Sequence, residues 1–114
     1  MNVIDYQINA AKTIVRHPYL PTEMHRRLLV WAAIGLPGEV GEIIEPIKKA
    51  LFQGEELDKE HLKDEIGDAI WYLNFICVAL EISLEEVMER NLDKINKRYP
   101  NGFSVQDSIM REKK

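Results

Sequence analysis

Several residue types that would point to particular classes of protein are scarce in this sequence of 114 residues. Cysteine occurs once, at Cys77 in an apolar stretch, which excludes a disulfide framework and a cysteine-based metal cluster. Lysine and arginine total 15 against 19 acidic residues, so the basic excess that nucleic-acid binding requires is absent. No apolar run approaches the ~20 residues of a membrane-spanning helix. We therefore expect neither a nucleic-acid partner nor a membrane.

The N-terminal stretch also lacks the build of a signal peptide, in which a charged segment precedes an apolar one. Hydrophobic residues make up 46% of the chain and charged residues 30%, a balance typical of globular domains and not of disordered segments. The length corresponds to one domain, residues 1–114. These features predict a single cytoplasmic domain.

Helical periodicity dominates the sequence, and no stretch shows the alternation of a strand or an internal repeat. Apolar spacing, capping residues and turn residues together predict four helices and an all-α, four-helix bundle. The expected helices span residues 2–16, 22–51, 59–80 and 84–99, and residues 104–114 form a tail. Asp58 and Ser83 are the expected N-caps, and Gly54 is the expected stop of the second helix. Because Pro37 and Pro46 lie inside that helix, we expect a kink near residues 35–38.

The second expected helix carries acidic residues in an unusual place, beside its apolar stripe. At 100° per residue, Glu39 and Glu42 lie about 60° apart at the edge of that stripe, and Glu45 turns away toward solvent. The stripe consists of Val40, Ile43, Ile44 and Ile47. Glu65 and Asp68 repeat the three-residue spacing on the third helix, whose second half, "AIWYLNFICVAL", is apolar enough for a central position.

Four carboxylates from two helices would repel one another strongly in a cleft of low dielectric constant. A hard cation would offset this repulsion, and ligands that are all oxygen favour Mg²⁺, with Mn²⁺ as a substitute. A di-iron bundle would need Glu-x-x-His pairs, which are absent. The alternative interpretation is that each pair lies on a solvated helix edge.

The fourth helix carries polar groups that could face such a cleft. Asn91, Lys94 and Arg98 are spaced i, i+3, i+7 and could bind phosphate oxygens. The alternative is a solvated helix whose basic end suits its dipole. Trp31 is a candidate for stacking on a base, and Tyr72 falls between Glu65 and Asp68 in angular position. The roles of Glu45, His25 and His61 stay open.

Longer motifs now give a family resemblance. Glu39-Val-Gly-Glu42 and Glu65-Ile-Gly-Asp68, within "GLPGEVGEI" and "EIGDAIWYL", together with "NLDKINKRYPNGF", resemble the MazG-like nucleoside triphosphate pyrophosphohydrolases of the all-α NTP pyrophosphatase superfamily. The resemblance covers residues 28–103, with a weaker echo at "YQINAAKT". Pro37 and Pro46, which flank the first motif, depart from the family pattern.

The resemblance implies Mg²⁺-dependent hydrolysis of a nucleoside triphosphate to the monophosphate and pyrophosphate, which would clear unwanted nucleotides. On this basis Glu39, Glu42, Glu65 and Asp68 bind metal, and one of the glutamates activates water. Asn91 and Lys94 match positions that contact phosphate or sugar, and Tyr72 matches an aromatic residue near the substrate. The resemblance also implies a homodimer or homotetramer with sites near the subunit interface.

Two alternatives remain. A related pyrophosphohydrolase would act on a substrate similar to phosphoribosyl-ATP, and a non-catalytic helical module would bind nucleotides or oligomerise without turnover. The sequence leaves open the preferred base and sugar, the number of metal ions, and the choice between dimer and tetramer.

Overall fold

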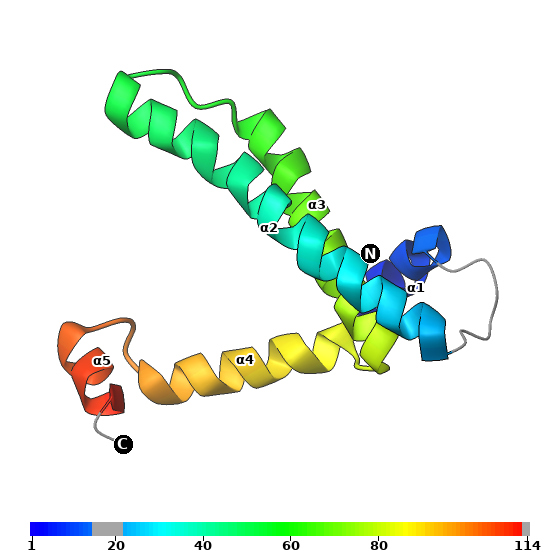
Figure 1. Cartoon of the computed structure of the whole chain (residues 1–114). Coiled ribbons are helices and arrows are strands. Elements are labelled where there is room, and N and C mark those ends of the chain that lie inside the picture. Colours follow the sequence, from blue (N-terminus) through cyan, green and yellow to red (C-terminus); the bar gives the residue numbers. More distant parts are fainter. Residues whose placement is uncertain (15–21, 113–114) are drawn as a thin grey trace.

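The structure is a computed structural model that describes residues 1–14 and 22–112. Within these ranges every regular element is a helix, which confirms the all-α class. Four helices correspond to those expected, and a fifth, short helix forms within the tail (Figure 1). The helices are α1 (Val3–Ile14), α2 (Thr22–Gln53), α3 (Lys59–Leu80), α4 (Leu84–Arg98) and α5 (Val105–Glu112).

The predicted capping and stop residues of the second, third and fourth helices are confirmed, whereas the expected end of the first helix at residue 16 lies outside the described residues. Asp58 caps α3 through its Oδ1 atom, which accepts hydrogen bonds from the backbone N–H groups of Glu60 and His61, each at 3.1 Å. Ser83 Oγ accepts a hydrogen bond of 3.3 Å from the N–H of Glu86 at the start of α4. Gly54, with φ of +70°, follows the last residue of α2. The helix α2 runs without a break through both prolines, at positions 37 and 46.

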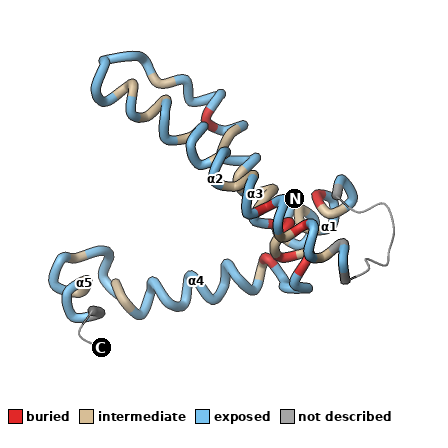
Figure 2. The backbone as a smooth tube through the Cα atoms, viewed as in Figure 1, coloured by how far each residue is buried: buried red, intermediate tan, exposed pale blue. Residues whose placement is uncertain are grey.

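A small hydrophobic core lies where α2 and α3 cross near α1. Leu28 and Ala32 from α2 pack with Phe75 and Ala79 from α3, and each is at most 4% exposed. Aromatic rings surround Phe75, whose ring centroid lies 4.4 Å from that of Trp71 in an edge-to-face arrangement. Figure 2 shows that buried residues concentrate at this junction. The apolar second half of α3 is therefore central to the core, as its composition predicts.

A single side chain, Gln7 of α1, holds the connection between α3 and α4. Its Nε2 donates to the carbonyl of Ile82 at 2.8 Å, and its Oε1 accepts from the N–H of Leu84 at 3.0 Å. Its own carbonyl accepts from Nδ2 of the fully buried Asn74 at 3.4 Å. The chain bends by 108° between α3 and α4, and this network fixes the bend.

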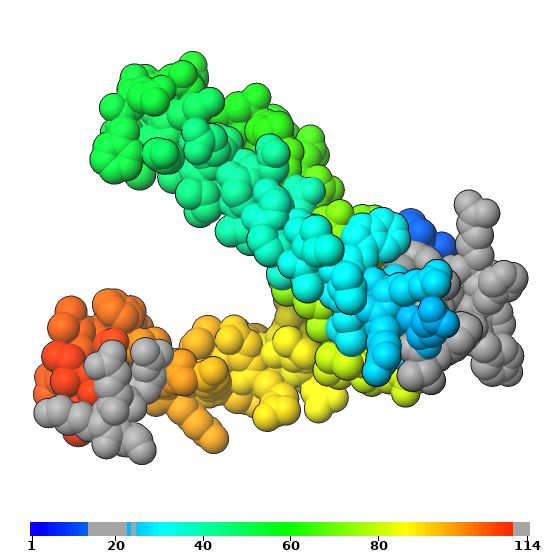
Figure 3. Space-filling model, viewed as in Figure 1, coloured from blue at the N-terminus to red at the C-terminus, as the bar shows by residue number. Residues whose placement is uncertain are grey.

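After the bend, α4 runs away from the α2–α3 pair. It packs against α1 at one end and α5 at the other. Figures 1 and 3 show open space between the α2–α3 pair and the arm formed by α4 and α5. The radius of gyration is 17.5 Å, whereas a compact chain of this length would have roughly 13 Å. Among the described residues, no single helix is long and apolar enough to cross a membrane.

Candidate metal centre

Three carboxylates from α2 and α3 meet halfway along the paired helices. Glu39 comes from α2, and Glu65 and Asp68 come from successive turns of α3. One oxygen atom from each of the three lies within 4.8 Å of the others. Glu39 and Glu65 are partly buried and Asp68 is exposed, so the group opens to solvent on one side.

The environment of Glu39 shows that this arrangement disfavours three separate negative charges. Its Oε2 atom is buried and has no hydrogen-bond partner in the described structure. The pKa of Glu39 is raised above its ordinary value, chiefly because its protonated form can share a hydrogen bond with the carboxyl group of Glu65, and also by burial. The negative charges of Asp68, Glu65 and Glu42 raise this pKa further. In the absence of a cation, Glu39 therefore retains a proton more readily than an isolated glutamate does.

The donor set fits a hard divalent cation. All three groups offer oxygen, and the unpartnered Oε2 of Glu39 is an acceptor that no described protein group satisfies. Mg²⁺ binds through carboxylate oxygens and commonly retains water molecules, which the exposed side near Asp68 would admit. A bound cation would remove the repulsion that raises the pKa of Glu39.

The other glutamates of α2 lie farther from this group. Glu42 is exposed and outside the set of three, but its charge acts on Glu39. Glu45, one turn further along, is also exposed, in agreement with the expected direction toward solvent. It does not contribute to the raised pKa of Glu39. The sequence pattern places Glu39 and Glu42 alike at the edge of the apolar stripe. In the structure, only Glu39 belongs to the group of three carboxylates.

Two further residues approach the carboxylates. His61 lies one turn before Glu65, and its Nε2 is 3.6 Å from Glu65 Oε1, whose side chain is 15% exposed. Tyr6 of α1 is close enough to Asp68 for that charge, after burial, to raise its pKa. The sequence does not single out Tyr6, because only the packing of α1 against α3 brings it to this edge. The weaker family resemblance of "YQINAAKT", which begins at Tyr6, was the one feature of the sequence that pointed to this residue.

The aromatic candidates Trp31 and Tyr72 both pack near the core. Trp31 is 52% exposed, and its ring meets Phe75 edge to face at 5.2 Å between centroids. The partly buried Tyr72 lies directly against the backbone of Gly35, so α2 and α3 approach closely at that point. Both aromatic residues therefore pack at the α2–α3 junction.

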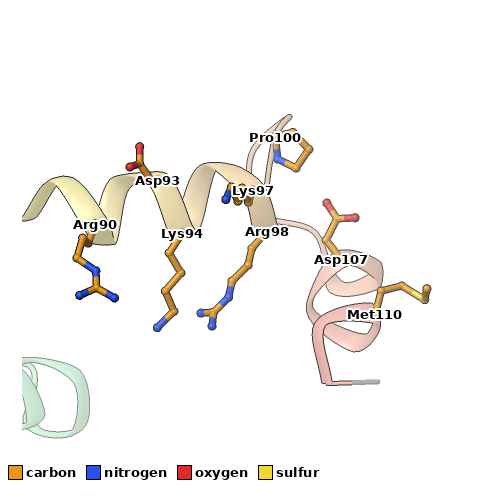
Figure 4. Close-up of a pocket in the computed structure, with 8 residues that line it drawn as sticks. All are labelled: Arg90, Asp93, Lys94, Lys97, Arg98, Pro100, Asp107 and Met110. Carbon is orange, nitrogen blue, oxygen red and sulfur yellow. The ribbon is translucent and has the colours of Figure 1, made fainter. Parts of the chain in front are cut away.

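The structure does not bring the polar face of α4 to the carboxylates of the same chain. Asn91 and Lys94 are exposed, and α4 has turned away from α2 and α3. Two of the predicted phosphate contacts, Lys94 and Arg98, instead line a cavity of about 630 Å³ between α4 and α5. Figure 4 shows that Arg90, Lys94 and Arg98 project from the same side of α4. Their role in substrate binding stays a prediction.

Known proteins resemble this chain over the residues that carry the acidic motifs. The family model described as MazG nucleotide pyrophosphohydrolase domain matches residues 32–103, a range that contains all four acidic residues of the two motifs. The chain is 32% identical over 106 residues to the Gene 37 protein of Mycobacterium phage L5. That alignment covers 90% of this chain and 92% of the relative. No solved structure matches significantly.

Proposed function

Since the chain belongs to the MazG nucleotide pyrophosphohydrolase family, we propose that it hydrolyses nucleoside triphosphates to the monophosphate and pyrophosphate with Mg²⁺. One observation carries the proposal: three carboxylates lie together, and a buried oxygen of one of them, Glu39 Oε2, has no hydrogen-bond partner among the described residues. Such a group suits a cation that neutralises phosphate charge. The biological role that follows is removal of unwanted nucleotides from the pool.

The positions of the carboxylates give them different expected roles. Glu39, Glu65 and Asp68 would hold the metal directly, and the exposed Glu42 would join them or bind through water. Bound Mg²⁺ would neutralise developing charge on the phosphates and lower the pKa of a coordinated water. One of the glutamates would orient or deprotonate the attacking water. Phosphoryl chemistry requires mainly such positioning and charge stabilisation, so it needs no nucleophilic side chain.

Substrate contacts would come from the remaining candidates. Lys94 and Arg98 offer charged donors for phosphate oxygens, and Asn91 offers an amide on the same helix. Trp31, half exposed, would stack on the base, and Tyr72 would line the nucleoside side of the site. Because α4 diverges from the carboxylates of its own chain, these groups would act together only in an assembly.

We infer that this assembly is a homodimer or homotetramer. The accessible surface of the chain is 9085 Å², whereas a compact monomer of 13.3 kDa would expose roughly 6,400 Å². The excess of roughly 2,600 Å² is on the scale that obligate interfaces bury. Much of it is apolar: α4 exposes Val87, Met88, Leu92 and Ile95 by 38–55%. An isolated chain would leave this face in water.

Local clusters of opposite charge on the two arms indicate how copies would associate. The α2–α3 pair carries the acidic group, and α4 carries a row of cations beside its apolar face. A two-fold arrangement would bring the carboxylates of each copy against the row of cations of the other. Light scattering after size exclusion should give a mass of two or four chains. Replacing Leu92 with Glu should lower that mass, and a monomeric wild-type protein would exclude the assembly.

The test of activity is pyrophosphate release from a panel of ribo- and deoxyribonucleoside triphosphates, with Mg²⁺ and with EDTA. We expect metal-dependent release with an equal amount of monophosphate, and the ranking of substrates would identify the preferred base and sugar. A phosphoribosyl-ATP-type substrate belongs in the panel as a comparison. Release of inorganic phosphate without pyrophosphate would contradict the proposed reaction.

A further inference from the structure

His61 lies beside the carboxylate group and has no role in the proposed function. It stands in the first turn of α3, where its backbone N–H donates to Asp58 Oδ1 at 3.1 Å. Its imidazole Nε2 lies 3.6 Å from Oε1 of Glu65, one turn further along the helix. Glu65 is one of the three clustered carboxylates. A nitrogen donor therefore adjoins a group whose three members all offer oxygen.

The separation of 3.6 Å suits two ligands of one metal ion better than a direct hydrogen bond. Hydrogen bonds from N–H to oxygen have nitrogen–oxygen distances of about 2.7–3.2 Å. Two ligand atoms that each lie about 2.1 Å from one ion, at an angle of about 110–120°, are roughly 3.4–3.6 Å apart. Ligands four residues apart on a helix can bind a single ion, because they lie on the same face. The His61–Glu65 pair meets both requirements.

The exposure of the pair leaves room for an ion and its water. The side chain of His61 is 50% exposed, whereas that of Glu65 is 15% exposed. Solvent therefore reaches the imidazole, and water can complete a coordination shell that two protein ligands begin. An ion pair between the same residues would need a protonated imidazole, whereas the neutral imidazole is the form that binds metal.

The nitrogen donor decides which ions this pair prefers. Imidazole is a good ligand for Zn²⁺ and Ni²⁺, whereas Mg²⁺ takes oxygen ligands and keeps its water. At sites that combine nitrogen and oxygen, Mn²⁺ binds more weakly than the later metals of its row. The pair therefore favours a different class of cation from the one that the three carboxylates favour.

We propose that His61 and Glu65 form a binding site for a late transition-metal cation, such as Zn²⁺ or Ni²⁺, at the edge of the carboxylate group. His61 Nε2 and Glu65 Oε1 are its two protein ligands, and water supplies the others. Because Glu65 also belongs to the group proposed to bind Mg²⁺, the two cation sites are neighbours. The inference concerns metal binding alone and does not depend on whether the chain hydrolyses nucleotides.

The test is calorimetric titration of the full-length protein with Zn²⁺ and, separately, with Mg²⁺, at neutral pH and without nucleotide. His61→Gln should weaken the binding of Zn²⁺ at least ~10-fold, because the nitrogen ligand is lost. The affinity for Mg²⁺ should stay the same, since Mg²⁺ takes oxygen ligands. His25→Gln is the matched control, because His25 lies on α2 outside the carboxylate group. It should change neither affinity.

Nitrogen NMR of the imidazole rings identifies the ligand atom directly. Zn²⁺ should shift the Nε2 resonance of one histidine. His61→Gln should remove that resonance, and His25→Gln should retain it. Circular dichroism of each variant checks that it is folded.

Three results would overturn the proposal. The first is that the wild-type protein does not bind Zn²⁺ at submillimolar concentration. The second is an unchanged affinity of His61→Gln for Zn²⁺, which would leave a surface ion pair. The third is an equal loss of affinity for Mg²⁺ and Zn²⁺, which would make His61 a residue that orients Glu65. Because the titrations contain no nucleotide, a lack of nucleotide hydrolysis would contradict the proposed function and leave the result for Zn²⁺ as it stands.

Discussion

Gly35 of α2 lies against the ring of Tyr72 on α3, so closely that an added Cβ atom would overlap ring carbons Cε1 and Cζ. This contact joins the two helices that carry the carboxylates. The position of Tyr72 is thus set by packing on α2, whether or not its ring also contacts substrate.

Replacing Gly35 with Ala should therefore destabilise the protein, because the rigid ring must move or the helices must separate. Overpacking of this kind costs about 1–3 kcal/mol, more than the roughly 1 kcal/mol that alanine gains over glycine in a helix. Thermal or urea unfolding measures the difference. Gly38→Ala is the matched control, because nothing lies within 4 Å of the Cβ atom it would add. We expect that variant to be neutral or more stable, and equal behaviour of the two would contradict the close contact.

Neutralising the carboxylates that we propose to bind metal should abolish turnover without unfolding the chain. We expect Glu42→Gln and Asp68→Asn each to lower kcat at least ~100-fold, the scale of loss when a group that stabilises the transition state is removed. Their stability should be unchanged or increased, since repulsion around Glu39 is relieved. Glu45→Gln, on the same helix but outside this electrostatic group, should keep its activity. Full activity of either charge-neutralised variant would exclude that residue from the centre.

The raised pKa of Glu39 predicts how stability depends on pH without metal. The folded protein holds this proton more tightly than the unfolded chain, in which glutamate has its ordinary pKa of 4.5. The contribution of Glu39 to stability is therefore full below that pH and is lost as pH rises through the higher, folded pKa. Urea unfolding in EDTA at a series of pH values measures it. Glu39→Gln should remove the loss of stability between pH 4.5 and the folded pKa. An unaltered dependence of stability on pH would contradict the attribution of this loss to Glu39.

Adding Mg²⁺ should reverse this destabilisation. A ligand that binds only the folded state adds about 2.7 kcal/mol at a concentration of 100 times its Kd. The increase in Tm should grow as pH rises, because the carboxylates must be deprotonated to bind metal. Thermal scans with and without Mg²⁺ measure this, with Asp68→Asn as the variant that should lose the response. An equal shift in both proteins would indicate binding elsewhere.

The helices and their ends could be predicted from sequence because their signals are local. Asp58 and Ser83 act on backbone groups two or three residues away, and Gly54 supplies the positive φ that follows α2. Glu65 and Asp68 lie together because a three-residue spacing places them on adjacent turns of one helix. Such features depend on neighbours within a single element.

Other features depend on contacts that periodicity does not encode. The direction of α4 follows from hydrogen bonds that Gln7 makes from a helix some 75 residues away in sequence. The approach of Tyr6 to Asp68 likewise requires α1 to pack on α3. Half of the apolar stripe of α2 is exposed in one chain, with Val40 at 45% and Ile44 at 53%, whereas Ile43 and Ile47 are partly buried. Its partner would be supplied by association, and a single sequence does not indicate which surface provides it.

The uninterrupted course of α2 through two prolines has a mechanical consequence. Since proline has no N–H group, residues 37 and 46 cannot bond to the carbonyls of Ala33 and Glu42 one turn earlier. The segment between them carries Glu39 and Glu42, and it is bounded at each end by a turn that lacks one hydrogen bond. It can therefore tilt slightly as a short rod, so the two glutamates would adjust together to an arriving cation while both halves of the helix keep their register.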